Sequence, residues 1–304
     1  MQHLKRILII GFFGLYWSNL LCQQVSDTSY DPVIHSPMYQ PGTGPTVFID
    51  EGHYNFHTKD GRYAPFAKIL EKDGYQVRSY KGEFIEEYLH KGKILVIANA
   101  INKANVDDWS LPTPSAFTKE EIETLKNWVA NGGRLFLIAD HMPWPGANEA
   151  LASAFGFTFY NGFNIDVVNP AYFRKSNGTI PDNVITRGRD STEAVSQIPR
   201  TEGQAFQIPP DAHPILLFSD SCLILLPDTA WEFNSSTPLK NINGWSQGAF
   251  KTYGKGKVVV FGEASMFSAQ IGDDNRKMGM NSIGAEDNHK LLLNIIHWLD
   301  DKIQ

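Results

Sequence analysis

Residue types that can transfer protons or hold a metal ion are concentrated in one stretch of the chain, TVFIDEGHYNFHT at residues 46–58. The stretch begins as a buried strand and then supplies five polar residues within eight positions: Asp50, Glu51, His53, Asn55 and His57. Three interpretations are open: a catalytic loop, a metal site, or a polar turn that faces water. The elements around the stretch have to decide among them.

Short apolar runs alternate with helical patterns along the first half of the chain. The apolar runs lie at residues 46–50, 75–80, 93–100 and 134–140. The helical patterns between them lie at residues 62–74, 84–92 and 118–133. Such alternation predicts an α/β fold in which a parallel sheet is flanked by helices.

The clearest helix is predicted to begin at Thr118. The spacing of Thr118 and Glu121 matches a capping box, and the pattern ends at Asn-Gly-Gly, where glycine can adopt the left-handed conformation that closes a helix. The following run, residues 134–139, is almost entirely apolar. It is therefore expected to form a central strand that is buried on both faces.

The rest of the chain is expected to complete a single α/β domain at residues 46–304. Further strands are predicted at residues 213–218, 221–226, 248–253 and 257–262, with the last two joined by GKGK as a hairpin. A terminal helix is predicted within NHKLLLNIIHWLDDK. Residues from about 160 to 213 have little periodicity and are interpreted as an insertion over the site. Residues 23–45 carry four prolines and are interpreted as an extended leader rather than a packed element.

The N-terminus has the pattern of a signal peptide. Lys5 and Arg6 precede an apolar run from Ile7 to Leu21, after which the chain turns polar next to Cys22. The run is short for a membrane span, so residues 1–22 are predicted to be removed from an exported protein, periplasmic or secreted, with no span in the mature chain. A lipoprotein acylated at Cys22 is the weaker alternative, because Leu21 is bulky.

The charge balance makes nucleic acid an unlikely partner. Loss of Lys5 and Arg6 changes the count of basic against acidic residues from 27 against 33 to 25 against 33, a formal charge of −8. Such a charge repels nucleic acid and anionic membrane surfaces. If Cys22 is removed, Cys222 is the last cysteine, so neither an intramolecular disulfide nor a cysteine-based metal site is expected. The oligomeric state stays open.

Polar residues also follow other predicted strands. Asn99 follows the third strand, Asp140 and His141 follow the fourth, and Glu263 follows KVVVFG. In open parallel sheets, ligands bind where the carboxyl ends of the strands meet. Polar residues at several strand ends therefore favour one shared site over a polar turn in a single loop.

Three chemistries could use these residues. A serine or cysteine hydrolase needs its nucleophile in a sharp turn after a strand, but the fourth strand ends in Ala-Asp-His-Met. His53, His57 and His141 could bind a metal ion with nearby carboxylates, although no Glu follows the first His as it does in zinc proteases. Proton transfer is favoured, with His53 and His141 as base and acid and Glu263 orienting a histidine.

Substrate contacts are predicted from the same loops and from the insertion. Arg200, beside TEGQAF, is the arginine expected to bind a carboxylate or a sulfate. Trp144, within MPWPGAN, could stack on a sugar face. The full set of predicted substrate-binding residues is Glu51, Asn55, His57, Asp140, Trp144 and Arg200.

Four motifs together resemble a family of secreted bacterial proteins known as a domain of unknown function: VFIDEGHYNFHT, LFLIADHMPWPGA, TEGQAF and GKGKVVVFGEASMFSAQ. The resemblance spans residues from about 46 to 300 and implies a glutamine-amidotransferase-like (flavodoxin-like) fold. Asp140 and His141 stand where an amidotransferase has its cysteine, so glutaminase activity is not implied. Such domains are associated with hydrolases that remove unsaturated uronic acids in polysaccharide utilisation systems, which implies uronate-containing oligosaccharides such as ulvan as substrates.

The leading hypothesis is a lyase of the dehydratase type that eliminates water from a terminal uronic acid. The reaction needs a base, an acid for the leaving hydroxyl, and a group that neutralises the carboxylate. No cofactor is expected, although a metal ion is possible. Two alternatives stay open: a metal-assisted hydrolase or esterase acting on glycans, and a glycan-binding protein without catalytic activity.

Overall fold

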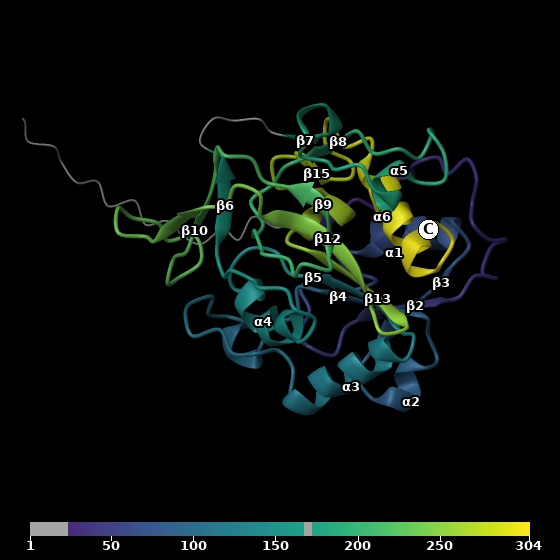
Figure 1. Ribbon diagram of the computed structural model, residues 1–304, viewed down its shortest axis with the longest axis horizontal. Helices are drawn as coiled ribbons and strands as arrows, with labels where there is room; N and C mark the ends of the chain where they lie inside the picture. Colours follow the sequence, from purple (N-terminus) through teal and green to yellow (C-terminus); the bar gives the residue numbers. More distant parts are fainter. Residues whose placement is uncertain (1–23, 167–171) are drawn as a thin grey trace, which may run out of the picture.

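The computed structural model describes residues 24–166 and 172–304, and the predicted signal peptide lies outside them (Figure 1). A seven-stranded sheet has the order β3-β2-β4-β5-β13-β12-β9. Its strands are β2 (Thr46–Asp50), β3 (Gln76–Tyr80), β4 (Ile94–Ala98), β5 (Arg134–Ile138), β9 (His213–Leu217), β12 (Ser246–Tyr253) and β13 (Gly256–Phe261). Strands β3, β2, β4, β5 and β13 are parallel, and β12 is antiparallel to β13 and β9.

The two central strands are buried on both faces, as their uninterrupted apolar sequences predict. All residues of β4 and β5 are buried. In β5, Phe136 and Ile138 pack into one hydrophobic core, while Leu135 and Leu137 pack into a second core on the opposite face. Alternation of side chains along a strand produces this division.

Helices cover both faces of the sheet, which confirms the predicted parallel sheet flanked by helices. One core includes side chains of α1 (Ala64–Lys72), α5 (Val184–Arg187) and α6 (Asn288–Leu299). The opposite core includes side chains of α2 (Glu86–Leu89), α3 (Lys119–Ala130) and α4 (Trp144–Ala154). Across the described ranges, no helix has the length and apolar character needed to cross a membrane.

The capping box predicted for α3 is present. The Thr118 hydroxyl accepts a hydrogen bond from the Glu121 backbone amide, and the Glu121 carboxylate accepts one from the Thr118 backbone amide. Helix α4 was not predicted, because the two prolines of MPWPGAN suggest a loop. Pro145 lies in the first turn of α4, where the missing N–H costs nothing and the fixed φ angle suits a helix.

Within residues 24–166 and 172–304, three small sheets and three short 3₁₀ helices accompany the large sheet. Strands β11, β10 and β6 form one sheet, β7 pairs with β8, and β1, β14 and β15 form the third. The β6 and β10 strands lie at the left of Figure 1, beside the large sheet. The bounds are β1 (Val25–Ser26), β6 (Phe163–Asp166), β7 (Tyr172–Arg174), β8 (Gln197–Pro199), β10 (Cys222–Leu225), β11 (Leu239–Asn241), β14 (Ala269–Ile271), β15 (Lys277–Gly279), η1 (Lys103–Asn105), η2 (Lys175–Asn177) and η3 (Ser265–Phe267).

The region interpreted as an extended leader has little regular structure but makes specific contacts. Strand β1 pairs with β14, and the Met38 backbone amide donates a hydrogen bond to Asp73 at 2.7 Å. Lys72 of α1 donates to Asp31 at 3.0 Å and to the Pro32 carbonyl at 2.8 Å. Residues 24–45 therefore make specific contacts with strand β14 and with helix α1.

Candidate functional site

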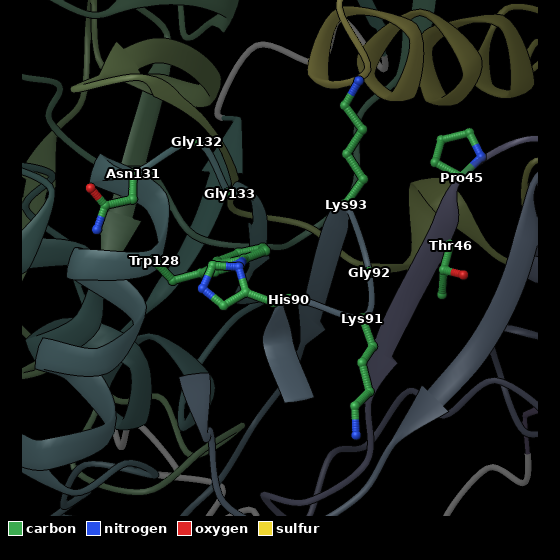
Figure 2. Close-up of a pocket in the computed structure, with 10 residues that line it drawn as sticks. All are labelled: Pro45, Thr46, His90, Lys91, Gly92, Lys93, Trp128, Asn131, Gly132 and Gly133. Atoms are coloured by element: carbon green, nitrogen blue, oxygen red, sulfur yellow. The ribbon is translucent and has the colours of Figure 1, made fainter. Parts of the chain in front are cut away.

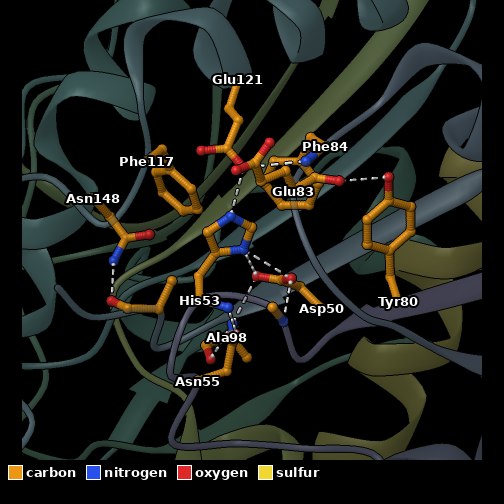
Figure 3. A network of polar contacts seen from close by, with 12 residues as sticks. Asp50, His53, Asn55, Tyr80, Glu83, Phe84, Ala98, Phe117, Glu121 and Asn148 are labelled. Atoms are coloured by element: carbon orange, nitrogen blue, oxygen red, sulfur yellow. Dashed lines mark hydrogen bonds and ion pairs between the residues drawn. The ribbon is translucent and has the colours of Figure 1, made fainter. Parts of the chain in front are cut away.

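Two clusters of polar side chains lie at the carboxyl ends of the parallel strands. One surrounds His53, in the loop after β2 (Figure 3). The other contains Asp140 and His141 after β5 and Glu263 after β13, and β5 and β13 are neighbours in the sheet. The prediction that polar residues gather at these strand ends therefore holds, but the residues divide into two groups with different environments.

At the opposite ends of the strands lies a hollow of about 420 Å³ (Figure 2). It is lined by the residues that precede β2, β4 and β5, among them Pro45, Lys93 and Gly133. Lys93 is already engaged, because it forms an ion pair with Asp300 at 2.7 Å. The hollow contains none of the predicted site residues, so the strand carboxyl ends remain the candidate site.

The imidazole of His53 lies between two carboxylates. Its Nδ1 is 3.0 and 2.9 Å from the two Asp50 oxygens, and its Nε2 is 2.9 Å from Glu121 Oε1. The rings of Phe84 and Phe117 lie 4.4 and 4.8 Å from the His53 ring. Because both ring nitrogens are bonded to carboxylates, neither is available to exchange a proton with a substrate. The structure therefore gives His53 a positioning role in place of the predicted base or acid.

The two carboxylates favour the protonated form of His53. Burial lowers the pKa of His53, but hydrogen bonds and negative charge from Asp50 and Glu121 outweigh burial, and the pKa is raised overall. Burial raises the pKa of Glu121, yet its hydrogen bonds from the Thr118 backbone and from His53 lower it overall. His53 and its partners thus form a buried ion pair that links the β2 loop to the start of α3.

Glu51 and Asn55, predicted to bind substrate, brace the same loop. Asn55 donates to Asp50 Oδ2 at 2.9 Å and accepts from the His53 backbone amide at 3.0 Å. Glu51 accepts from the Lys59 backbone amide at 2.9 Å and from the Ser79 hydroxyl at 2.8 Å. Their polar atoms are therefore directed at the protein.

Asp140 and Glu263 form a pair of buried carboxyl groups with raised pKa values. Their residues are 7% and 2% exposed. The pKa of Asp140 is raised to about 7. Burial is the largest cause, the charge of Glu202 acts in the same direction, and hydrogen bonds act in the opposite direction. Burial and the charge of Asp140 raise the pKa of Glu263 to about 7. The pKa values of both groups therefore lie near neutral pH, mainly because burial disfavours the charged form.

The backbone around Glu263 is shaped to hold its carboxylate. Glu263 accepts hydrogen bonds from the amides of Gly203 at 3.0 Å and Ser265 at 2.7 Å. A Cβ atom on Gly203 would overlap the carbonyl oxygen of Gly262, so only glycine allows this approach. The TEGQAF motif is thereby packed directly against the loop that follows β13.

Of the two histidines predicted to be catalytic, His141 is the one with a ring nitrogen suited to proton transfer. Its Nδ1 lies 2.7 Å from the Met142 carbonyl oxygen, which can only accept, so Nδ1 carries the proton in the neutral ring and Nε2 carries the lone pair. Burial lowers the pKa of His141, although the Met142 contact and the charges of Glu263 and Glu202 raise it. At neutral pH, Nε2 is therefore a proton acceptor.

Glu202 is a member of this cluster that sequence reasoning missed. It is exposed, and its negative charge raises the pKa values of both Asp140 and His141. Arg200, chosen from the same region, forms an ion pair with Asp166 of β6 and contacts Cys222. Arg200 was predicted to bind substrate because arginines stand out in an acidic chain. The charge from this region that raises the pKa values of Asp140 and His141 is instead that of Glu202, in the neighbouring TEGQAF motif.

His57 is buried and neutral, and among the described residues its hydrogen-bond partner is Asn99. Asn99 accepts from the Asp140 backbone amide at 2.9 Å through Oδ1, so its Nδ2 donates to His57 Nδ1 at 3.2 Å. Burial, with the charge of Arg62, lowers the pKa of His57 to about 3. The proton of the neutral ring is therefore on Nε2, which has no hydrogen-bond partner within the described ranges.

Arg62 supplies positive charge beside His57 and was also missed by sequence reasoning. Its guanidinium carbon lies 3.7 Å from the centre of the Phe56 ring. Burial lowers the pKa of Arg62, and its Nε, like His57 Nε2, has no partner among the residues that the structure describes. A buried N–H without a partner is rare in folded proteins, so these two donors call for a partner from outside the polypeptide, water included.

Trp144 lies inside a cluster of aromatic rings. It is 2% exposed, and its ring contacts those of His141 at 4.9 Å, Trp109 at 5.0 Å and Phe56 at 5.1 Å. A buried ring cannot offer a face to a sugar, so the predicted stacking role of Trp144 is wrong. An exposed ring of the same cluster is that of Trp231, which is 52% exposed and lies 4.7 Å from His141.

In the part of the chain that the structure describes, no group of three or more His, Cys, Asp or Glu side chains is arranged to hold a metal ion. His53 and His57, which the metal interpretation would combine, have different partners: the first is bonded to Asp50 and Glu121, and the second to Asn99.

Comparison with protein-family models and with curated proteins finds no match. Among solved structures, the chain is similar to the mmIFT52 N-terminal domain, with a TM-score of 0.59 and 17% identity over 83% of this chain and 96% of that one. It is also similar to a protein described as ThuA-like from Bacteroides uniformis, with a TM-score of 0.45 and 13% identity over 88% and 94% of the two chains. The first likeness shows a shared fold and leaves the activity open.

Replacement of His53 by Gln is expected to destabilise the protein most at low pH. Stabilisation from a group with a raised pKa is complete below its unfolded value of 6.5 and is lost as the pH rises through the folded pKa. Removal of the buried cation should cost about 3 kcal/mol at pH 6 and less at pH 9. Urea unfolding at both pH values measures the difference. His90→Gln, in an exposed pair with Glu86, is the matched control and should change nothing measurable; equal losses at both pH values for H53Q would contradict the assignment.

Replacement of Glu263 by Gln is expected to change stability in the opposite direction with pH. A carboxyl group whose folded pKa is raised from 4.5 to about 7 destabilises the fold as the pH rises between these values. The stability of E263Q relative to the original chain should therefore improve by about 3 kcal/mol between pH 4.5 and pH 8. Chemical denaturation at the two pH values tests this, with the exposed Glu149→Gln as control. A pH-independent difference would show that folding does not raise the pKa of Glu263.

Proposed function

We propose that the protein is a hydro-lyase that eliminates water from the terminal uronic acid of anionic oligosaccharides such as ulvan fragments. The observation that carries the proposal is the neutral His141, with its Nε2 lone pair, beside two carboxyl groups whose pKa values are about 7. A base and a proton source that coexist near neutral pH are what an elimination requires. The motif resemblance supports a uronate substrate and a glutamine-amidotransferase-like (flavodoxin-like) form of the fold.

The proposed reaction breaks one C–H bond and one C–O bond of the uronic acid. His141 Nε2 takes the proton from carbon 5, which is next to the carboxylate, and the electron pair of that bond forms the double bond between carbons 4 and 5. The hydroxyl on carbon 4 leaves with the electrons of its C–O bond and takes a proton from the Asp140 and Glu263 pair, so it departs as water. The proton on His141 is then returned to the carboxyl pair, which restores the starting state.

The difficult point of this reaction is the negative charge that develops on the substrate carboxylate as carbon 5 loses its proton. Arg62 contributes a positive charge, and His57 contributes the Nε2 proton that has no partner within the described residues. Donors fixed before the reaction stabilise such charge without reorganisation. Because the pKa of His57 is lowered to about 3, it donates as a neutral ring and does not compete with His141 for the proton.

The proposal predicts a conjugated double bond in the product. Incubation with ulvan oligosaccharides that end in a uronic acid should produce ultraviolet absorbance, and mass spectrometry should show loss of one water. His141→Gln should lower the rate about 100-fold or more, as expected for loss of a general base. His90→Gln, an exposed histidine, should leave the rate unchanged. Cleavage with a gain of water would indicate a hydrolase, and binding without any product would indicate a glycan-binding protein; either result refutes the elimination.

Replacement of His57 by Phe is expected to separate a role in charge stabilisation from a structural role. The phenyl ring can keep the contacts that His57 makes with Tyr63 at 4.7 Å and Phe56 at 5.6 Å, while the Nε2 donor is lost. We expect kcat/KM to fall about 100-fold, as for loss of one donor to a developing anion. Thermal unfolding should change little, because the variant also removes a buried N–H without a partner. A large fall in the melting temperature with unchanged kinetics of the folded fraction would assign His57 to the core.

A further inference from the structure

We infer that Trp231 forms a platform for a second sugar ring, so that the substrate is an oligosaccharide of at least two rings. The inference rests on the proposed function for one point, which is that the reactive uronate ring binds at His141. Nothing in the sequence singled out Trp231, which lies between β10 and β11. Its position, its exposure and the way it is held each support the inference.

Trp231 packs on the candidate site and still presents its ring to solvent. Its ring centre lies 4.7 Å from that of His141, with 70° between the planes, and 4.5 Å from that of Phe163. It remains 52% exposed. A sugar ring bound at His141 would therefore have the exposed indole of Trp231 beside it. A second sugar ring that is linked directly to the first could then pack on this indole.

The loop that carries Trp231 is tied to another loop of the site. The Ala230 amide donates to the Trp109 carbonyl at 3.0 Å, and the Leu111 amide donates to the Asp228 carbonyl at 2.8 Å. An isolated β-bridge between Ser110 and Thr229 lies between these two bonds. The indole is thus held in place before any ligand arrives, which lowers the entropic cost of binding.

The backbone of Trp231 adopts a conformation that a bulky residue avoids. Its φ angle is 68°, in the left-handed region. Tyr54 and Asn99, both in the loops at the strand carboxyl ends, share this conformation with φ angles of 49° and 50°. Strained residues of this kind collect at binding and catalytic sites, where the surrounding structure imposes the conformation. Selection for stability alone would favour glycine at position 231.

A sugar ring fits this surface better than a protein partner does. Trp231, Phe233 and the partly buried Trp109 are a few aromatic side chains, whereas a stable protein interface covers roughly 800 Å² per partner. A pyranose ring presents C–H groups on its faces and hydroxyl groups around its edge, so it can pack on an indole while its hydroxyls stay in water. An amphipathic ligand of this size suits one exposed indole beside polar side chains.

The test compares binding of one and two rings. Titration calorimetry in a His141→Gln background, which prevents turnover, would use glucuronic acid and a disaccharide with glucuronic acid at its non-reducing end. Trp231→Ala should weaken binding of the disaccharide about 10-fold and leave glucuronic acid unaffected. Phe233→Ala is the matched control: Phe233 is 43% exposed in the same loop and contacts Phe163 at 5.2 Å. It should leave both affinities unchanged.

A third variant excludes a structural explanation. Trp231→Gly relieves the left-handed backbone, so its melting temperature should equal or exceed that of the original chain while disaccharide binding is lost. The inference is overturned if the original chain binds the disaccharide no more tightly than glucuronic acid, or if the Trp231 variants weaken both ligands equally. If the disaccharide binds through Trp231 but the unsaturated product never forms, the proposed reaction is refuted while the site for the second ring is supported.

Discussion

The candidate site depends on one carboxylate that makes two kinds of contact. Glu121 Oε2 accepts from the Thr118 backbone amide and so closes the capping box of α3, while Oε1 accepts from His53 at 2.9 Å and from the Phe84 backbone amide at 3.1 Å. Helix α3 and the loop after β2 are therefore fixed by the same side chain. Because His57 lies four residues beyond His53 in this loop, the bridge also limits where His57 Nε2 can point.

His53 and His57 show that environment, and not residue type, assigns the chemistry of this loop. Asp50 and Glu121 raise the pKa of His53 and favour its protonated form, whereas His57 is neutral because it is buried and its neighbouring charge is that of Arg62. The two imidazoles thus differ in charge although they share one loop. In the proposed reaction this stretch consequently supplies a scaffold and a hydrogen-bond donor, and the acid and base are the residues that follow β5 and β13.

The fold was predictable from local patterns, and the site only in part. Apolar periodicity identifies the central strands, and the Thr118 to Glu121 spacing identifies the start of α3, because both signals act within a few residues. The His53 to Glu121 pair joins positions 68 residues apart, and no local pattern contains it. Arg62, Glu202 and Trp231 were missed for the same reason. Each is an ordinary surface residue in sequence, and only the tertiary arrangement places it beside His141 or His57.

The buried carboxyl groups of Asp140 and Glu263 lower the stability of the fold, and their proposed role in proton transfer explains why both would be retained. Asp140 and Glu263 follow the adjacent strands β5 and β13; burial is the main cause that raises the pKa of each to about 7, with the charge of Glu202 adding to it at Asp140 and the charge of Asp140 adding to it at Glu263. A fold selected for stability alone would replace one of them with an uncharged residue. Retaining both provides a proton source that is half loaded at neutral pH, beside a histidine whose tautomer is fixed by a backbone carbonyl. In the proposed reaction, the proton donor and the proton acceptor therefore differ by environment.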